Sequence, residues 1–251
     1  MVESKKIIKD CIADAIREEI NKLYRDLSML IEKNTVSAKN QMINSSRVYH
    51  LGNPTSNKKI LVVGNSITRH GPNKEIGWER DWGMAASTPE KDYVHRLFTM
   101  LTEDGQDVFM RVSQCANWEM NLQEQGILSD YDGDREFNAD IVVFRLGENV
   151  PDYNKPQFER ELKKFILHIC PNGKVIYMTC FWENPVIDEA IKRVAAEGGE
   201  VCIDGNFSKD EKNMALGQFA HNGVAMHPSD EGMEEIAKAI FNALKGVKYT
   251  L

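Results

Sequence analysis

Three short segments carry side chains whose types would suit nucleophilic attack on an ester carbonyl. Ser66 closely follows the apolar run Ile60–Gly64, and a serine hydroxyl becomes a nucleophile when a base lies beside it. His227 lies near the C-terminus, and imidazole is the commonest general base in proteins. Asn149 offers an uncharged amide, the kind of donor that stabilises a developing oxyanion.

Each of these residues also has an ordinary structural explanation. Ser66 is a suitable helix N-cap, and Asn149 is a typical turn residue. His227 precedes a proline at the predicted first position of the last helix, where it would either cap the helix or be kept neutral by the helix dipole and accept a proton. Position 68 is threonine, so the segment differs from the G-x-S-x-G elbow. Gly64 would permit a tight exit from the strand, and backbone N–H groups at the following turn would be free to bind an anion.

The elements that would position these residues alternate along the chain. Apolar β-type runs occur at Lys59–Gly64, Asp107–Ser113, Asp140–Leu146, Lys174–Cys180 and Glu200–Ile203. Helical patterns occur at Lys91–Glu103, Glu119–Leu128, Pro156–Ile169, Val186–Glu197 and Pro228–Leu244. This alternation predicts an α/β fold of three layers, with a five-stranded parallel sheet covered by helices on both faces.

Polar and aromatic residues follow the predicted strands, where such a sheet binds its ligands. All four tryptophans fall on this rim, together with three of the polar residues expected to line a substrate pocket. These candidate substrate-binding residues are Asn65, Trp78, Trp82, Asn117, Trp118, Glu148 and Trp182. The long loop Arg69–Glu90 is rich in Gly, Trp and charge, which indicates a binding element or a lid. The alternative for at least two tryptophans is packing beneath this loop.

Three of these segments together resemble a known family. Gly64-Asn65-Ser66-Ile67-Thr68, Gly147-Glu148-Asn149 and His227-Pro228 are similar to three of the four sequence blocks of the SGNH/GDSL hydrolases, in the same order and at strand ends. The resemblance covers residues 59 to 245. It implies a flavodoxin-like fold, an acylated Ser66 and His227 as the base. It also implies an oxyanion hole built from the Ser66 N–H, a glycine N–H of the second block and the Asn149 amide.

Two positions depart from the family pattern. The second-block loop, residues 114–118, reads Gln-Cys-Ala-Asn-Trp and has no glycine, so another backbone N–H must serve, and we assign Ala116 to this role. The family's Asp three residues before the histidine is replaced by Val224. We therefore expect a Ser-His dyad whose imidazole is oriented by a main-chain carbonyl or by another acid, such as Asp204 or Asp210.

The composition of the chain argues against several classes of function, among them nucleic-acid, membrane-surface and zinc binding. The chain has 251 residues, is 42% hydrophobic and carries a net charge of -7, which is enough for a full core and argues against nucleic-acid or anionic-membrane binding. The five cysteines, at positions 11, 115, 170, 180 and 202, show no zinc spacing and predict buried thiols in the cytoplasm. Cys115 lies on the rim, but the sequence shows no basic partner that would activate its thiol, so we expect a buried, unreactive cysteine. We expect no metal and no cofactor; His221, His227 and Asp230 match no zinc pattern.

The N-terminal segment differs from the rest. Residues 3–33 carry an apolar stripe at Ile16, Ile20, Leu23, Leu27 and Leu30, which predicts an amphipathic helix. It is expected either to lie on the main domain or to act as a dimerisation arm. Residues 34–58 are polar and turn-rich, so we assign residues 1–58 to helix and connector and residues 59–251 to the hydrolase-type domain.

Three functions remain open from the sequence. The first is a serine esterase that hydrolyses small acyl esters, with acetyl on a carbohydrate as the expected substrate. The second is an acyltransferase that passes the same acyl group to an alcohol. The third is a carbohydrate- or ligand-binding domain that keeps the fold without catalysis.

Overall fold

The computed structural model describes residue 41 and residues 47–246. The chain divides into two units, residues 1–37 and residues 38–251, and all the described residues belong to the second. The predicted N-terminal helix, its dimerisation role and Cys11 lie outside the described residues.

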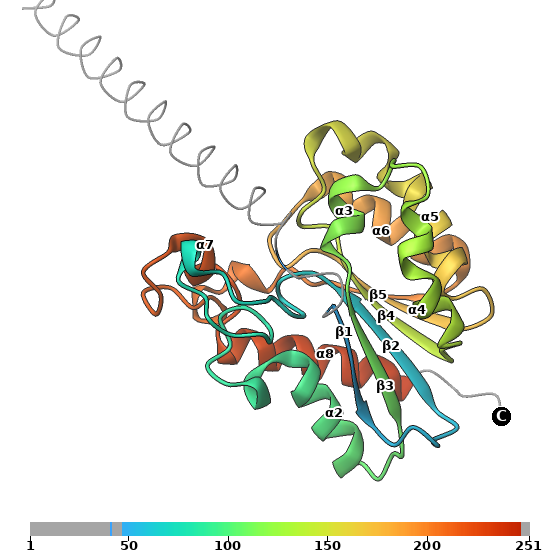
Figure 1. The fold of residues 1–251 in the computed structure, drawn as a ribbon, viewed down its shortest axis with the longest axis horizontal. Coiled ribbons are helices and arrows are strands. Elements are labelled where there is room, and N and C mark those ends of the chain that lie inside the picture. Colours follow the sequence, from blue (N-terminus) through green and yellow to red (C-terminus); the bar gives the residue numbers. More distant parts are fainter. Residues whose placement is uncertain (1–40, 42–46, 247–251) are drawn as a thin grey trace, which may run out of the picture. The chain divides into compact units, whose positions relative to one another are not determined.

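A six-stranded sheet forms the centre of the described unit (Figure 1). Five strands are parallel, and the spatial order of the whole sheet is β1-β3-β2-β4-β5-β6. The strands are β1 Val48–Gly52, β2 Lys59–Gly64, β3 Phe109–Gln114, β4 Ile141–Arg145, β5 Lys174–Met178 and β6 Val201–Ile203. Counted without β1, the parallel strands have the 2-1-3-4-5 order of flavodoxin-like folds, which confirms the predicted fold class.

The strand β1 adds to the five strands expected from sequence. It pairs antiparallel with β3 at the sheet edge and lies in the segment interpreted as a connector. None of its five residues is fully buried, so it lacks the continuous apolar character of the central parallel strands. An edge strand of this kind gives only a weak hydrophobic signal.

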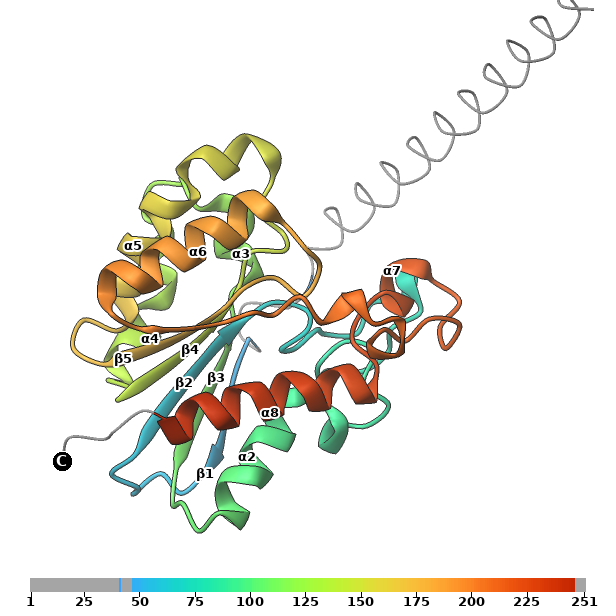
Figure 2. The ribbon, with the colours of Figure 1, turned by 180° about the vertical axis from the view of Figure 1, so that it is seen from behind.

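Helices cover both faces of the sheet (Figures 1 and 2). Helices α2 and α8 lie on one face, and α3, α4, α5 and α6 lie on the other. The α-helices are α2 Tyr93–Glu103, α3 Ala116–Asn121, α4 Asp132–Glu136, α5 Phe158–Ile169, α6 Pro185–Gly198, α7 Asn222–Ala225 and α8 Asp230–Gly246. Short 3₁₀ turns are η2 Lys74–Ile76, η3 Pro89–Lys91, η4 Ile127–Tyr131, η5 Asp152–Gln157, η6 Phe207–Lys209 and η7 Glu211–Asn213.

The core is split by the sheet into two layers. Ile60 and Val62 of β2 pack in the cluster that includes residues of α2 and α8. Leu61 and Val63, which alternate with them, pack in the cluster that includes residues of α5 and α6. All four side chains are fully buried, because the central strand of a parallel sheet is covered on both sides.

The single helix predicted over Glu119–Leu128 is wrong. The chain instead forms the short α3 and then turns at Gly126, whose φ of 85° is left-handed, into η4 and α4. The last helix also begins later than predicted, because the Ser229 hydroxyl accepts a hydrogen bond from the N–H of Gly232 and Ser229 thus acts as its N-cap. His227 therefore lies two residues before the cap, away from the strongest part of the helix dipole.

Candidate active site

The site lies where the direction of the chain's path across the sheet reverses. From β2 the chain passes to β3 on one side and then to β4 on the other, so the loops after β2 and β4 diverge. In open α/β sheets such a switch point leaves a crevice at the carboxyl ends of the strands. Ser66 follows β2, and Asn149 follows β4.

Gly64 allows the turn that presents Ser66. A Cβ atom at position 64 would lie 1.7 Å from Oγ1 of Thr68, so a larger residue would displace the turn. The N–H groups of Thr68 and Arg69 both donate to the carbonyl of Asn65, at 2.9 and 3.0 Å. Met84 N–H donates to the carbonyl of Ser66 at 2.9 Å and ties the turn to the long loop.

Ser66 and His227 lie in hydrogen-bonding contact. Ser66 Oγ is 2.9 Å from His227 Nε2, although the two residues are 161 positions apart. His227 Nδ1 is 2.6 Å from the carbonyl oxygen of Gly223. A carbonyl only accepts, so Nδ1 carries the hydrogen and Nε2 presents its lone pair to the serine hydroxyl. This is the tautomer that a general base requires.

Burial keeps His227 neutral. The side chain is almost fully enclosed, and burial, with a smaller effect of nearby cationic groups, lowers the pKa of His227 to about 3. Trp182 packs edge-on against the imidazole, with ring centroids 5.2 Å apart. The imidazole of His227 is therefore unprotonated throughout the neutral pH range.

The orienting group of His227 is a main-chain carbonyl, one of the alternatives expected from sequence. Asp204 hydrogen-bonds with Thr179 and Asn206, and Asp210 pairs with Lys212. Among residues 47–246, no carboxylate hydrogen-bonds with His227.

The three expected oxyanion donors differ in whether they already donate a hydrogen bond within the protein. Within residues 47–246, the Ser66 N–H has no hydrogen-bond acceptor in the structure, which leaves it available to a ligand. The Ala116 N–H donates to Oε1 of Gln114 at 3.2 Å. The Asn149 Nδ2 amino group donates to Oε2 of Glu119 at 2.7 Å; because this group has two hydrogens, one remains for a second acceptor.

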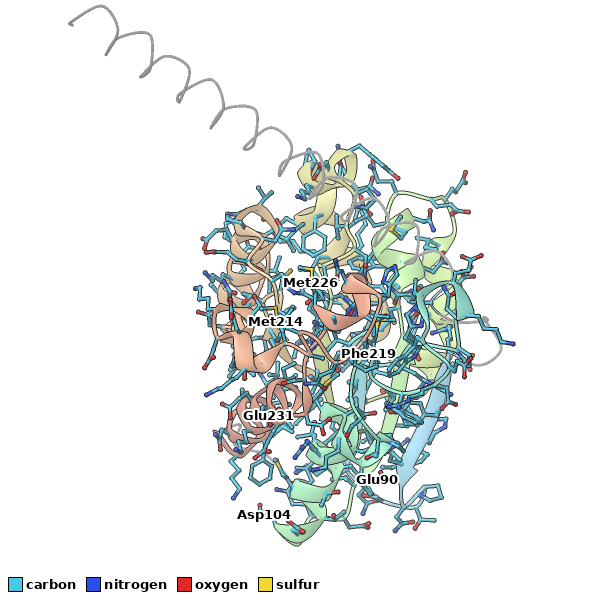
Figure 3. The ribbon with its side chains drawn as sticks, turned by 90° about the vertical axis from the view of Figure 1, so that its left-hand side faces the viewer. Glu90, Asp104, Met214, Phe219, Met226 and Glu231 are labelled. Atoms are coloured by element: carbon cyan, nitrogen blue, oxygen red, sulfur yellow. The ribbon has the colours of Figure 1, made fainter. Side chains whose placement is uncertain are left out.

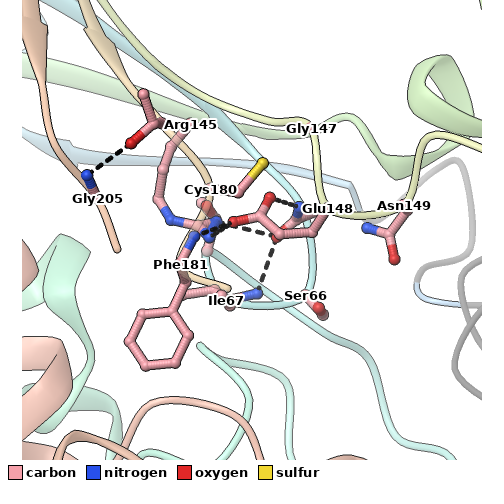
Figure 4. Close-up of polar contacts among 12 residues, drawn as sticks. Ser66, Ile67, Arg145, Gly147, Glu148, Asn149, Cys180, Phe181 and Gly205 are labelled. Atoms are coloured by element: carbon pink, nitrogen blue, oxygen red, sulfur yellow. Dashed lines mark hydrogen bonds and ion pairs between the residues drawn. The ribbon is translucent and has the colours of Figure 1, made fainter. Parts of the chain in front are cut away.

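A buried charged network joins the ends of four strands. Asn65 Nδ2 donates to Glu119 at 3.2 Å and to Glu148 at 2.7 Å, while its Oδ1 accepts from Arg145 Nη1 at 3.1 Å. Figure 4 shows Glu148 bound to Arg145 and, at 3.0 Å, to the main-chain N–H of Phe181. The polar groups of Asn65 and Glu148, expected from sequence to bind substrate, thus bind one another in this structure.

Glu119 is a buried carboxyl of this network with a shifted pKa. It is fully buried, and burial together with the negative charge of Glu148 raises the pKa of Glu119 to about 7, while its hydrogen bonds act in the opposite direction. Arg145, which is also buried, forms its ion pair with Glu148. The network therefore contains two carboxyl groups, those of Glu119 and Glu148, and one guanidinium, that of Arg145.

The four tryptophans divide into core and rim. Trp118 is fully buried and stacks on Phe165 at a centroid distance of 4.4 Å. Trp78 is also buried, and its indole N–H donates a hydrogen bond to the carbonyl of His70 at 3.0 Å. Trp82 and Trp182 are partly exposed. Of the four, Trp182 alone makes a ring contact with His227, and its own indole N–H is buried without a partner among the described residues.

The loop Arg69–Glu90 packs against the segment that carries His227. Its Trp78 and Met84 pack in one cluster with Ala215 and Val224, and Phe219 lies against Trp78 at 6.0 Å. Phe219 is labelled in Figure 3 on the side of the molecule that faces the viewer. The loop thus packs against the segment that leads to His227.

The remaining sequence candidates lie outside the catalytic contacts. Asn117 is exposed and bonds within α3 to Asn121. Cys115 is buried, and burial raises the pKa of its thiol far above its usual range, so it is unreactive. In the described part of the chain, no group of three His, Cys, Asp or Glu residues could hold a metal ion, and no helix has the length and apolarity to cross a membrane.

Sequence reasoning missed Glu119 and Arg145. The sequence pattern predicts a helix that starts at Glu119, whereas α3 begins at Ala116 and directs the Glu119 carboxyl to Gly147 and Asn149. Arg145 lies inside an apolar strand run, and a charged residue in such a position was a signal that a buried partner had to exist.

The fold is that of known hydrolases. The chain matches no family model and no curated protein sequence. Several solved structures are similar to it, among them two hydrolases. LAE5, an alpha/beta hydrolase enzyme from the metagenome of Lake Arreo, Spain, has a TM-score of 0.52 at 17% identity, over 77% of this chain and 98% of that one. The lipase/acylhydrolase from Enterococcus faecalis has a TM-score of 0.51 at 18% identity, over 75% and 96%. These likenesses confirm the predicted three-layer α/β fold.

Proposed function

We propose that this protein is a serine esterase that hydrolyses small acyl esters through an acyl-Ser66 intermediate. The observation that carries the proposal is the 2.9 Å contact between Ser66 Oγ and a neutral His227 Nε2 at the switch point of the sheet. A nucleophile and a base in this geometry, with free N–H donors nearby, satisfy the requirements of covalent acyl transfer.

The reaction has two steps. Ser66 Oγ attacks the ester carbonyl while His227 Nε2 takes the hydroxyl proton, and the Ser66 N–H and the Asn149 amide stabilise the oxyanion. His227 then protonates the leaving alcohol, and an acyl-serine remains. In the second step water attacks this ester, His227 takes the water proton and returns it to Ser66 Oγ as the acid departs.

For the substrate we propose a small acyl group, acetyl, carried on a carbohydrate. The partly exposed Trp182 beside His227 supports this proposal, since an indole ring offers an apolar surface to a sugar ring or an acyl group. The four described cysteines, Cys115, Cys170, Cys180 and Cys202, are free, which supports a location in the reducing cytoplasm.

Labelling with a fluorophosphonate tests the assignment directly. We expect stoichiometric labelling of Ser66, located by peptide mapping, and hydrolysis of p-nitrophenyl acetate. Ser66→Ala should lose roughly 10⁴-fold or more in kcat. Full activity in Ser66→Ala, or no labelling of folded protein, contradicts the proposal.

The same acyl-serine could be intercepted by an alcohol. Such an acyltransferase would use the same dyad, so product analysis with added sugar acceptors separates the two reactions. A purely ligand-binding domain would bind sugar while leaving Ser66 unlabelled.

A further inference from the structure

The carboxyl group of Glu119 is bound almost entirely to the loop that carries Asn149. Its Oε1 accepts from the main-chain N–H of Gly147 at 2.5 Å and from that of Asn149 at 3.4 Å. Its Oε2 accepts from the Asn149 side-chain amide at 2.7 Å. A fourth bond, from Asn65, ties the same carboxyl to the residue before the nucleophile.

We propose that Glu119 is a positioning residue of the oxyanion hole, which holds the Asn149 amide in the orientation that stabilises the oxyanion. The inference rests on the proposed esterase function. Glu119 does not touch substrate; it acts through Asn149.

The chemistry of these contacts requires a carboxylate. All four groups that reach Glu119 are N–H donors, and an ionised carboxylate only accepts. A glutamine of equal size would place one of its own N–H groups against a donor. Because Glu119 takes one hydrogen of Asn149 Nδ2, the second hydrogen is fixed in direction.

The charges around Glu119 make its burial unfavourable for stability, and an uncharged side chain that only filled the space would avoid this penalty. Glu148 lies close enough to raise its pKa, and the neighbouring Arg145 pairs with Glu148. A buried acid without its own cation is destabilising unless hydrogen bonds compensate for it. Here the compensating bonds are those that immobilise the Gly147–Asn149 segment.

A double-mutant cycle in the full-length protein tests the inference. Asn149→Ala should lower kcat about 10²–10³-fold with little change in KM, the usual cost of one oxyanion donor. Glu119→Gln should lower kcat roughly 10–10²-fold. The double variant should be no slower than Asn149→Ala, because Glu119 acts only through Asn149.

Asp134→Asn is the matched control. Asp134 is equally buried, and its carboxylate bonds Arg47, Arg111 and Ser113, away from the Gly147–Asn149 segment. This variant should be destabilised but keep kcat. Multiplicative losses in the double variant, or unchanged kcat in folded Glu119→Gln, overturn the inference, while loss of activity in Ser66→Ala still upholds the esterase.

If Glu119→Gln does not fold, the pH profile decides. Glu119 gains a proton as the pH falls through about 7, and one of its oxygens then ceases to be a strong acceptor. The kcat of the unaltered protein should fall between about pH 8 and about pH 6, while that of Asn149→Ala should stay flat. A flat profile in the unaltered protein, or the same fall in Asn149→Ala, contradicts the inference.

Discussion

The Nδ1 atom of His227 lies 2.6 Å from the carbonyl oxygen of Gly223, four residues earlier in the same short segment. The segment is closed by a hydrogen bond from the His227 N–H to the carbonyl of Val224 at 2.9 Å. The backbone thus takes the orienting place that an aspartate at position 224 has in the family that the sequence resembles. The Val224 side chain instead packs in an apolar cluster with Trp78 and Met84 of the long loop.

Restoring the family's acid should therefore fail. Val224 is fully buried among apolar side chains, so Val224→Asp should lower the free energy of unfolding by about 3 kcal/mol or more without raising kcat. Urea denaturation and esterase kinetics measure the two effects. The uncharged Val224→Thr is the control for shape. A higher kcat in a stably folded Val224→Asp would show that the carbonyl is a poor substitute for the acid.

The pH dependence of stability should reveal a second buried histidine. Burial lowers the pKa of His70 to about 4, below its ordinary value of 6.5. Between these values the unfolded chain binds the proton and the folded protein does not, so stability is lost as the pH falls through this window. The loss is roughly 1 kcal/mol per pH unit for this group.

The variant His70→Gln isolates this effect. Denaturation of both proteins at about pH 7 and about pH 5 should show a smaller loss of stability on acidification in the variant. Equal losses would mean that His70 takes up a proton in the folded state.

Substitution of two tryptophans should affect different properties, stability for Trp118 and kinetics for Trp182. Trp118→Ala removes a fully buried ring that stacks on Phe165 and should cost about 3–5 kcal/mol of stability. Trp182→Ala removes a partly exposed ring beside His227 and should change KM and kcat with a smaller effect on unfolding. Thermal unfolding and steady-state kinetics distinguish the two. An unchanged KM and kcat in Trp182→Ala would remove this residue from the proposed substrate site.

Gly147 should resist enlargement. Its φ is 145°, and a Cβ atom would lie 2.6 Å from Cγ2 of Ile187 and 2.8 Å from Sγ of Cys180. Gly147→Ala should therefore cost about 1–3 kcal/mol and lower kcat, because Asn149 would be displaced. Gly77→Ala is the matched control: its φ is 67°, and among the described residues no atom would contact the added Cβ. It should cost less and leave kcat unchanged.

The parallel core of the fold could be predicted because its signals are local. The strand β2 has the predicted bounds, Lys59–Gly64, because a run of apolar β-forming residues that ends at a glycine can be identified without knowing which strands pair with it. The strand β1 and the break after α3 were not predicted. The position of β1 depends on pairing with β3, and the break depends on a left-handed turn at Gly126.

The sequence by itself determined that the chain alternates strands with helices and that Ser66, Asn149 and His227 follow or flank these elements. These properties depend on residue type and near neighbours. Only the tertiary structure decided that Trp118 lies in the core while Trp182 contacts His227, that a carbonyl accepts from the His227 ring, and that Glu119 binds the Asn149 loop. Burial and hydrogen-bond partners arise from packing between segments far apart in the chain, and no local pattern encodes them.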